Sequence, residues 1–206
     1  MEDNKFVLSN FYNNYTLNIF SDGSYKNGIS TYGIIALEKD FIVNGQVVKT
    51  DDINNINLVE LKAIRASLSM ARSYLGKYKY INIFSDSKTS VAKVLKYYNS
   101  TKNTTNQTLL QIKEIYKLID ACPDTLVTIY YTPGHVSSSR RGIKESHNKF
   151  MNNNNLESCD VKLIKYLARG NDLVDRSCTM YRKYNYADKT ICPINLLGGE
   201  ENDQIQ

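Results

Sequence analysis

The sequence predicts an α/β fold built on a mixed five-stranded sheet, with three antiparallel strands plus parallel strands, flanked by helices. Alternating β-prone runs and helical periodicities follow one another in the order β-β-β-α-β-α-α-β, and a last helix lies near the C-terminus. Two of the strand-like runs, residues 15–21 and 80–85, are near copies, and each is followed by an aspartate. This repetition indicates that two strands deliver acidic groups in the same way.

The first three strands are expected to form an antiparallel meander over residues 15–21, 31–38 and 41–50. Asp22-Gly23 is a turn-forming pair, so we expect the first strand to end there, with a carboxylate at its end. Lys39-Asp40 gives the next two runs the spacing of a hairpin.

A helix from about residue 58 to 75 follows, because apolar residues recur there every three or four positions. The strand 80–85 then returns after this helix and can lie parallel to the first strand through a right-handed crossover. Asp22 and Asp86 would therefore be neighbours at one edge of the sheet.

The remaining elements are helices at 87–98 and 107–121, a strand at 126–131 and a final helix from about 171 to 184. Residues 137–169 fit this plan poorly because they hold a run of asparagines and no clear strand, and we interpret them as a basic surface insertion with a short helix near its end. The domain is expected to span 15–192, between an N-terminal extension (1–14) and a polar, acidic tail (193–206).

Length and composition limit the classes of protein to which this chain can belong. The 206 residues carry 26 basic and 21 acidic side chains, and the net charge of +5 permits a polyanionic partner. The chain has no apolar run long enough to cross a bilayer and no leader-like start, which disfavours a membrane protein and a secreted one. The 4 cysteines are widely spaced and the chain has 2 histidines, which argues against structural zinc and a disulfide framework. We expect an intracellular monomer, cytoplasmic or nuclear.

Four carboxylates are candidate ligands, and each has an ordinary alternative. Asp22 could initiate a turn, and Glu60 could form a capping box with Asn57. Asp86 could be a helix N-cap, and Asp175 could lie on the wet side of the last helix. As a group they can converge on one point, where each pair about 5 Å apart would repel by roughly 3 kcal/mol and would need cations. Oxygen ligands favour Mg²⁺, with Mn²⁺ as a substitute, and two such ions could clamp a phosphodiester.

Six segments carry a family resemblance. They are Ile19-Phe20-Ser21-Asp22-Gly23-Ser24, Tyr32-Gly33-Ile34-Ile35, Val59-Glu60-Leu61-Lys62-Ala63, Ile83-Phe84-Ser85-Asp86-Ser87, Pro133-Gly134-His135 and Gly170-Asn171-Asp172-Leu173-Val174-Asp175. In order and spacing they resemble the motifs of type 1 ribonuclease H, over most of the chain from residue 15 to about 184. The resemblance implies that family's five-stranded fold and an endonuclease that cuts the RNA strand of an RNA–DNA hybrid, leaving 5′-phosphate and 3′-hydroxyl ends.

The resemblance also implies ligand roles. Asp22 would bridge two metal ions, and Asp175 would complete the site of the ion that activates water. Glu60 and Asp86 would hold the second ion, which neutralises the departing 3′-oxygen. Asp172, one helical turn earlier, competes with Asp175, but the motif aligns the later aspartate with the family's ligand.

The two histidines receive different interpretations. His135 follows a Pro-Gly pair after a strand, and the resemblance implies a mobile loop residue that assists proton transfer or product release. The alternative is an ordinary surface histidine. His147 matches no motif and is expected to be solvated.

Substrate contacts follow from the need to recognise 2′-hydroxyls and phosphates. Asn57 matches a 2′-hydroxyl contact, and Gly23 and Ser24 would present backbone groups beside the scissile strand. Asn106 resembles a residue that grips a DNA phosphate. Each could equally be a helix cap.

The sequence departs from the family in three places. The glycine-rich loop is shortened at residues 25–29, and segment 97–105 has no tryptophan, so the basic aromatic protrusion of many relatives looks absent. The basic stretch 137–169 separates His135 from the last motif; it could contact phosphates in place of the protrusion, or be a solvated loop. Two other functions compete: a DNA nuclease or junction resolvase of the same fold, and a non-catalytic nucleic-acid-binding module.

Overall fold

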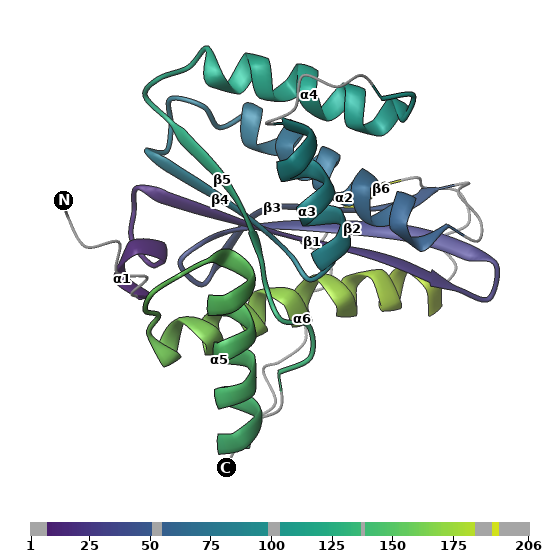
Figure 1. The fold of residues 1–206 in the computed structure, drawn as a ribbon. Coiled ribbons are helices and arrows are strands. Elements are labelled where there is room, and N and C mark those ends of the chain that lie inside the picture. The colour runs from purple at the N-terminus through teal and green to yellow at the C-terminus, as the bar shows by residue number, and fades with distance from the viewer. Residues whose placement is uncertain (1–7, 51–54, 99–103, 137–138, 184–190, 194–206) are drawn as a thin grey trace.

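The fold was obtained as a computed structural model that describes residues 8–50, 55–98, 104–136, 139–183 and 191–193. One twisted sheet runs through the molecule, with helices on both of its faces (Figure 1). The strands are β1 (Thr16–Lys26), β2 (Ile29–Glu38), β3 (Phe41–Thr50), β4 (Tyr80–Ser85), β5 (Leu126–Tyr131) and the short β6 (Ile191–Pro193). Their order across the sheet is β5-β4-β1-β2-β3-β6.

The predicted five-stranded mixed sheet is confirmed. β1, β2 and β3 form the antiparallel meander, while β4 pairs in parallel with β1 and β5 in parallel with β4. β6 was not expected; it extends the sheet by pairing antiparallel with β3. The tail expected from residue 193 therefore begins within this strand, and the rest of it, like residues 1–7 of the N-terminal extension, lies outside the described residues.

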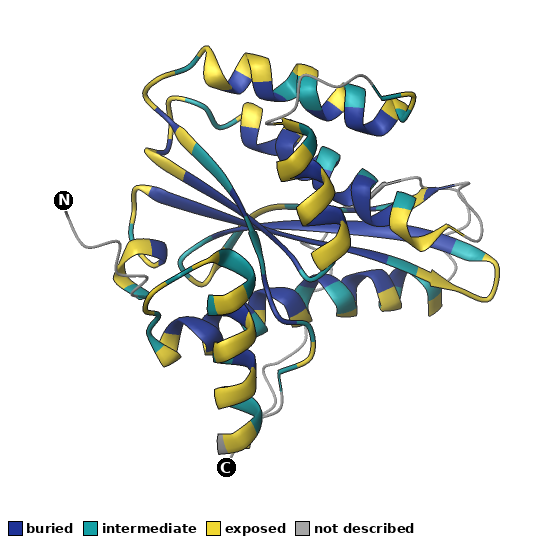
Figure 2. Cartoon of the chain, viewed as in Figure 1, coloured by how far each residue is buried: buried dark blue, intermediate teal, exposed yellow. Residues whose placement is uncertain are grey.

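The helices form one layer on each face of the sheet (Figure 1). α2 (Ile56–Arg72), α3 (Lys88–Tyr98) and α4 (Gln107–Asp120) cover one face, and α1 (Leu8–Phe11), α5 (Arg140–Asn154) and α6 (Val161–Lys183) cover the other. Each layer closes its own apolar core against the sheet, whose central strands are buried along most of their length (Figure 2). Among the described helices, none is long and apolar enough to span a membrane.

The first strand is longer than predicted. β1 continues through Asp22 to Lys26, because the residues after Asp22 stay paired with β2. The chain turns at Asn27-Gly28 instead, where φ is 52° and 77°. Two successive left-handed residues are the geometry of a tight hairpin turn, and Asn-Gly adopts it readily. Asp22 is therefore an interior strand residue; the expected strand end at Asp22 and the alternative that it initiates a turn are both wrong.

We expected residues 137–169 to form a basic surface insertion with a short helix near its end, but most of this stretch is helical. Apart from 137–138, which lie outside the described residues, these residues form α5, a short connection at 155–160 and the first turns of α6, which begins at Val161 rather than near residue 171. Phe150 and Leu163 are completely buried in the core beneath the sheet. Asn154, within the asparagine run, accepts from the backbone N–H of Tyr131 (2.9 Å) and donates to its carbonyl (2.8 Å). The asparagine run suggested a surface loop. The Asn154 amide instead pairs with the backbone of β5, as a neighbouring strand would.

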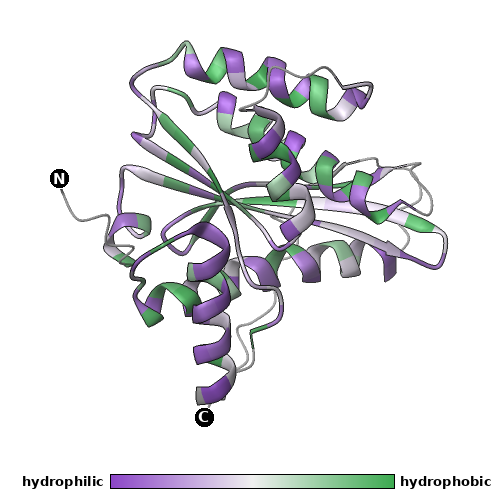
Figure 3. Cartoon of the chain, viewed as in Figure 1, coloured by the Kyte–Doolittle hydropathy of each residue, from purple (hydrophilic) through white to green (hydrophobic). Residues whose placement is uncertain are grey.

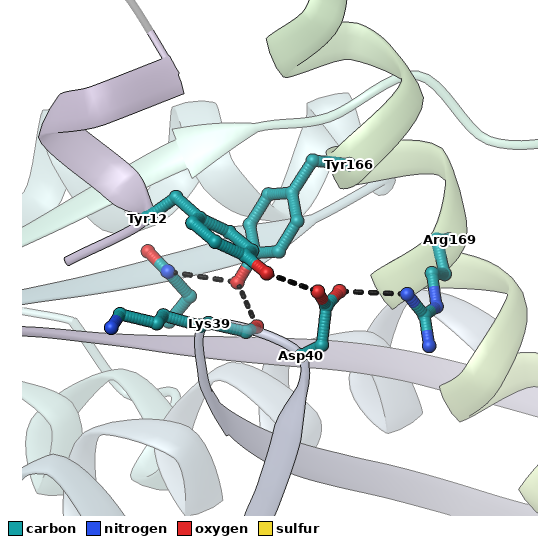
Figure 4. A network of polar contacts seen from close by, with 6 residues as sticks. Tyr12, Lys39, Asp40, Tyr166 and Arg169 are labelled. Atoms are coloured by element: carbon teal, nitrogen blue, oxygen red, sulfur yellow. Dashed lines mark hydrogen bonds and ion pairs between the residues drawn. The ribbon is translucent and has the colours of Figure 1, made fainter. Parts of the chain in front are cut away.

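A polar network holds α6 against the β2–β3 turn, at the end of the strands far from Asp22 (Figure 4). Arg169 donates to Asp40 at 2.7 Å, and Tyr12 donates to the same carboxylate. The Tyr166 hydroxyl donates to the carbonyl of Lys39 at 3.0 Å. These contacts join the residue after α1, the β2–β3 turn and α6, so the long helix is held at its N-terminal half while its C-terminal half runs beneath β1 and β2.

Candidate metal centre

The sheet register brings the two strand-borne aspartates together. β1 and β4 are parallel, with Ser21 opposite Ser85. Asp22 and Asp86 are the next residues of each chain segment, so they leave neighbouring strands at the same point. This confirms the predicted proximity, although Asp22 is reached within a strand and not at its end.

Glu60 is delivered from α2 onto the same point. The helix begins at Ile56 with Asn55 as its N-cap, whose side chain accepts from the N–H of Leu58 at 3.1 Å. The capping box considered for Asn57 and Glu60 is therefore wrong. The Glu60 carboxylate instead accepts from the backbone N–H of Gly23 at 3.2 Å.

Gly23 makes this approach possible. A Cβ at residue 23 would lie 2.8 Å from the backbone nitrogen of Glu60, closer than van der Waals contact allows. A side chain here would push α2 away from β1 and would take the Glu60 carboxylate with it.

Asp22, Glu60 and Asp86 each offer a carboxylate oxygen, and these atoms lie within 4.8 Å of one another. Asp22 and Glu60 are only 8% and 9% exposed. Burial, followed by repulsion from Asp86 and Asp175, raises the pKa of Asp22 to about 7. Burial, followed by repulsion from Asp22 and Asp86, raises the pKa of Glu60 to about 9. A divalent cation would relieve this unfavourable crowding of negative charge.

Asp175 approaches the cluster from α6. Its charge raises the pKa of both Asp22 and Asp86, although its carboxylate is not within the 4.8 Å group. Asp172 is exposed, and it is not among the groups that perturb the pKa values of these carboxylates. Of the two competing aspartates, Asp175 is thus the one beside the cluster.

The loop after β5 lies against Asp86. A Cβ at Gly134 would lie 2.6 Å from the Asp86 Oδ2 atom. The neighbouring His135 is exposed, has a left-handed backbone with φ of 34°, and lowers the pKa of Asp86 through its charge. We expected His147 to be solvated, but its side chain is half-buried. One of its ring nitrogens lies 2.7 Å from the Cys159 carbonyl oxygen.

The predicted substrate residues lie in different settings. Asn57 is exposed in the first turn of α2. Asn106 is the N-cap of α4, accepting from the N–H of Leu109 at 3.1 Å, so the capping alternative holds for this residue. Ser24 accepts a hydrogen bond from Arg182.

The sequence interpretation missed two residues beside the carboxylates. Asn171 is buried, its side chain hydrogen-bonds Asp86, and this bond lowers the pKa of that carboxyl. Arg182 lowers the pKa of Asp22 through its charge. Arg182 lies seven residues after Asp175, or about two helical turns, so helical periodicity could have placed both on one face.

Comparisons with known proteins agree with the fold. A sequence profile of the RNase H family matches residues 14–157. The structure is similar to prototype foamy virus protease–reverse transcriptase, with 15% identity and a TM-score of 0.51, over 84% of this chain and 21% of that one. It is also similar to LC11-RNase H1 in complex with an RNA/DNA hybrid, with 14% identity and a TM-score of 0.44 over 57% and 85% of the two chains. RNase H1 from the archaeon Halobacterium salinarum NRC-1 is 17% identical to this chain, with a TM-score of 0.41, and the similarity covers 66% of this chain and 93% of that one.

No curated protein sequence matches the chain. The structural likenesses are at low identity and speak to the fold, whereas the family match covers more than half of the sequence. With the acidic cluster that joins β1, the end of β4 and α2, this match identifies the chain as a member of the RNase H family.

Proposed function

We propose that the protein is an endoribonuclease that hydrolyses the RNA strand of RNA–DNA hybrids with the help of divalent metal ions. The observation that carries this proposal is the convergence of Asp22, Glu60 and Asp86, with Asp175 beside them, in a chain of the RNase H family. A metal-dependent nuclease needs such a cluster to hold its ions, whereas a module that only binds nucleic acid gains nothing from buried carboxylates facing a polyanion.

The donor set fits hard divalent cations. All candidate ligands are carboxylate oxygens, which suit Mg²⁺ and accept Mn²⁺. Asp22 would be shared by two ions, with Asp175 completing one site and Glu60 and Asp86 the other. When bound, the ions supply an activated water and neutralise the leaving 3′-oxygen, which gives 5′-phosphate and 3′-hydroxyl products.

Several residues of the chain would prepare this reaction. The hydrogen bonds from Gly23 to Glu60 and from Asn171 to Asp86 hold two carboxylates in a fixed orientation. His135, exposed on the loop beside Asp86, would move a proton or assist product release.

Recognition of the hybrid would draw on exposed polar groups around the cluster. The exposed Asn57 would hydrogen-bond a 2′-hydroxyl, and Ser24 would lie beside the scissile strand. The N–H of Gly23 is already bonded to Glu60, so Gly23 would act through the close approach that it permits. Asn106 would grip a DNA phosphate only through groups left over from its capping role.

The helix α5 is a candidate second contact with the nucleic acid. Its exposed residues include Arg141, Lys144 and Lys149, and its surface is hydrophilic over most of its length (Figure 3). It follows directly on the His135 loop, so its basic side chains could contact phosphates beyond the cleavage site. Glu145 pairs with Arg141 at 2.8 Å, which leaves the two lysines as the stronger candidates.

A substrate panel tests the proposal. The protein, assayed with Mg²⁺ on end-labelled RNA–DNA hybrid, duplex DNA, duplex RNA and a DNA four-way junction, is expected to cut the RNA strand of the hybrid alone. Cleavage of the junction or of duplex DNA would favour a DNA nuclease of the same fold, and cleavage of none would favour a binding module.

We further propose that the protein acts as an intracellular monomer, in the cytoplasm or nucleus.

A further inference from the structure

A second polar cluster lies next to the carboxylates, between α6 and the β1–β2 hairpin. The guanidinium of Arg182 donates to the hydroxyl of Ser24, to that of Thr31 at 3.4 Å and to that of Thr179 at 3.0 Å. We call these four residues the Arg182 cluster. Arg182 is half-buried and Thr31 is completely buried, so the cluster is built into the fold on one side and open on the other.

Arg182 has no ion-pair partner among the described residues, although its charge acts on Asp22. In the part of the chain that the structure describes, the hydrogen-bond partners of Arg182 are all hydroxyls. The ion pairs of α5 and α6 involve Arg141 and Arg169 instead. A guanidinium set among hydroxyl groups is a common arrangement for holding a phosphate, because the arginine supplies charge and paired donors while the hydroxyls supply further donors.

The strand register fixes where this cluster lies relative to the carboxylates. Asp22 and Ser24 are two residues apart on one face of β1, a separation of about 7 Å along a strand. Their partners on β2 are Gly33 and Thr31. The charge of Arg182 reaches Asp22. A phosphate bound by the cluster would therefore be close to, but distinct from, one held over the carboxylates.

We propose that the Arg182 cluster binds a phosphate of the RNA strand adjacent to the scissile phosphate, and that Arg182 thereby positions the strand for cleavage. This inference rests on the proposed function and adds a specific contact to it. The alternative is a purely structural tether between α6 and the β1–β2 hairpin.

The test uses a strand in which a short ribonucleotide run, flanked by deoxynucleotides, confines cleavage to one region of a hybrid. Neutral methylphosphonate linkages are placed one at a time around the cleavage site. For the unmodified protein we expect one linkage next to the scissile phosphate to reduce kcat/KM about tenfold. The same linkage should have little further effect on Arg182→Gln, because the charge that it removes no longer has a partner.

Salt dependence provides a second readout. Losing one phosphate contact should reduce the slope of log kcat/KM against log salt by about one in Arg182→Gln. Arg182→Lys should retain most of the slope. Lys79→Gln removes the same charge from an exposed residue just before β4, at the other end of the strands from Ser24, and should leave both readouts unchanged.

The outcomes separate the possibilities. A tether would make Thr31→Val and Arg182→Gln lose stability alike, with no dependence on any single linkage. If no flanking linkage slows the unmodified protein, or if Arg182→Gln is as sensitive to it as the unmodified protein, the inference is wrong. If the unmodified protein does not cut the hybrid at all, the proposed function fails instead.

Discussion

Replacing Asp22 with asparagine should make the metal-free protein more stable. Asp22 is 8% exposed, and burial together with the charges of Asp86 and Asp175 raises its pKa to about 7. In the unfolded chain an aspartate has a pKa of about 3.9. Between these values the folded protein holds the proton more tightly than the unfolded one, so rising pH favours unfolding.

The size of the effect follows from the two pKa values. At about 1.4 kcal/mol per pH unit, the difference corresponds to about 4 kcal/mol at pH values above 7, and to almost nothing below about pH 3, where both states are protonated. Asparagine cannot ionise and so removes the penalty. Because the neighbouring carboxylates titrate together with Asp22, we expect a measured gain of about 2–4 kcal/mol.

Urea unfolding in the presence of a chelator measures this gain. At pH 8.5 Asp22→Asn should exceed the unmodified protein in free energy of unfolding by about 2–4 kcal/mol, and at pH 4.5 the difference should fall to about 1 kcal/mol or less. Asp172→Asn, an exposed change on α6, is the matched control and should have no effect at either pH. Equal stabilities at pH 8.5, or the same gain at both pH values, would refute the reasoning.

Three further predictions concern other parts of the chain. His135→Ala should lower kcat by about tenfold or more while the affinity for Mg²⁺, followed by calorimetry, stays unchanged, since His135 is not one of the ligands proposed; a parallel loss of Mg²⁺ affinity would contradict this. Phe150→Ala should cost about 3–5 kcal/mol in urea unfolding because Phe150 is completely buried. A cost under 1 kcal/mol would show instead that α5 is a dispensable surface segment. Lys144→Gln combined with Lys149→Gln should raise KM and flatten its salt dependence, with Lys79→Gln as the control, and an unchanged salt slope would remove α5 from the binding surface.

The sequence predicted the parts of the fold that depend on local pattern. The strand-then-aspartate repeat at Asp22 and Asp86 required a parallel pair, and the register of β1 and β4 confirms it. The helix carrying Glu60 was also expected, but its cap was misplaced by two residues, because Asn55 and Asn57 are chemically equivalent and the backbone decides between them.

What the sequence did not predict depends on tertiary contacts. Phe150 and Leu163 looked like isolated apolar residues in a polar segment, and their burial arises from packing beneath strands distant in sequence. Asn154 looked like low-complexity sequence, yet its amide pairs with the backbone of Tyr131. Asn171 and Arg182 have no local signal for the bonds that they make, since Asp86 and Ser24 approach them only in the folded chain.

Single-turnover cleavage of a labelled RNA–DNA hybrid at increasing Mg²⁺ concentration, with the unmodified protein, Asp22→Asn and Asp172→Asn, tests the metal centre most directly. We predict at least a roughly hundredfold slower reaction for Asp22→Asn, because one shared ligand serves both ions, and an unchanged rate for Asp172→Asn. Equal rates for Asp22→Asn and the unmodified protein would contradict the account.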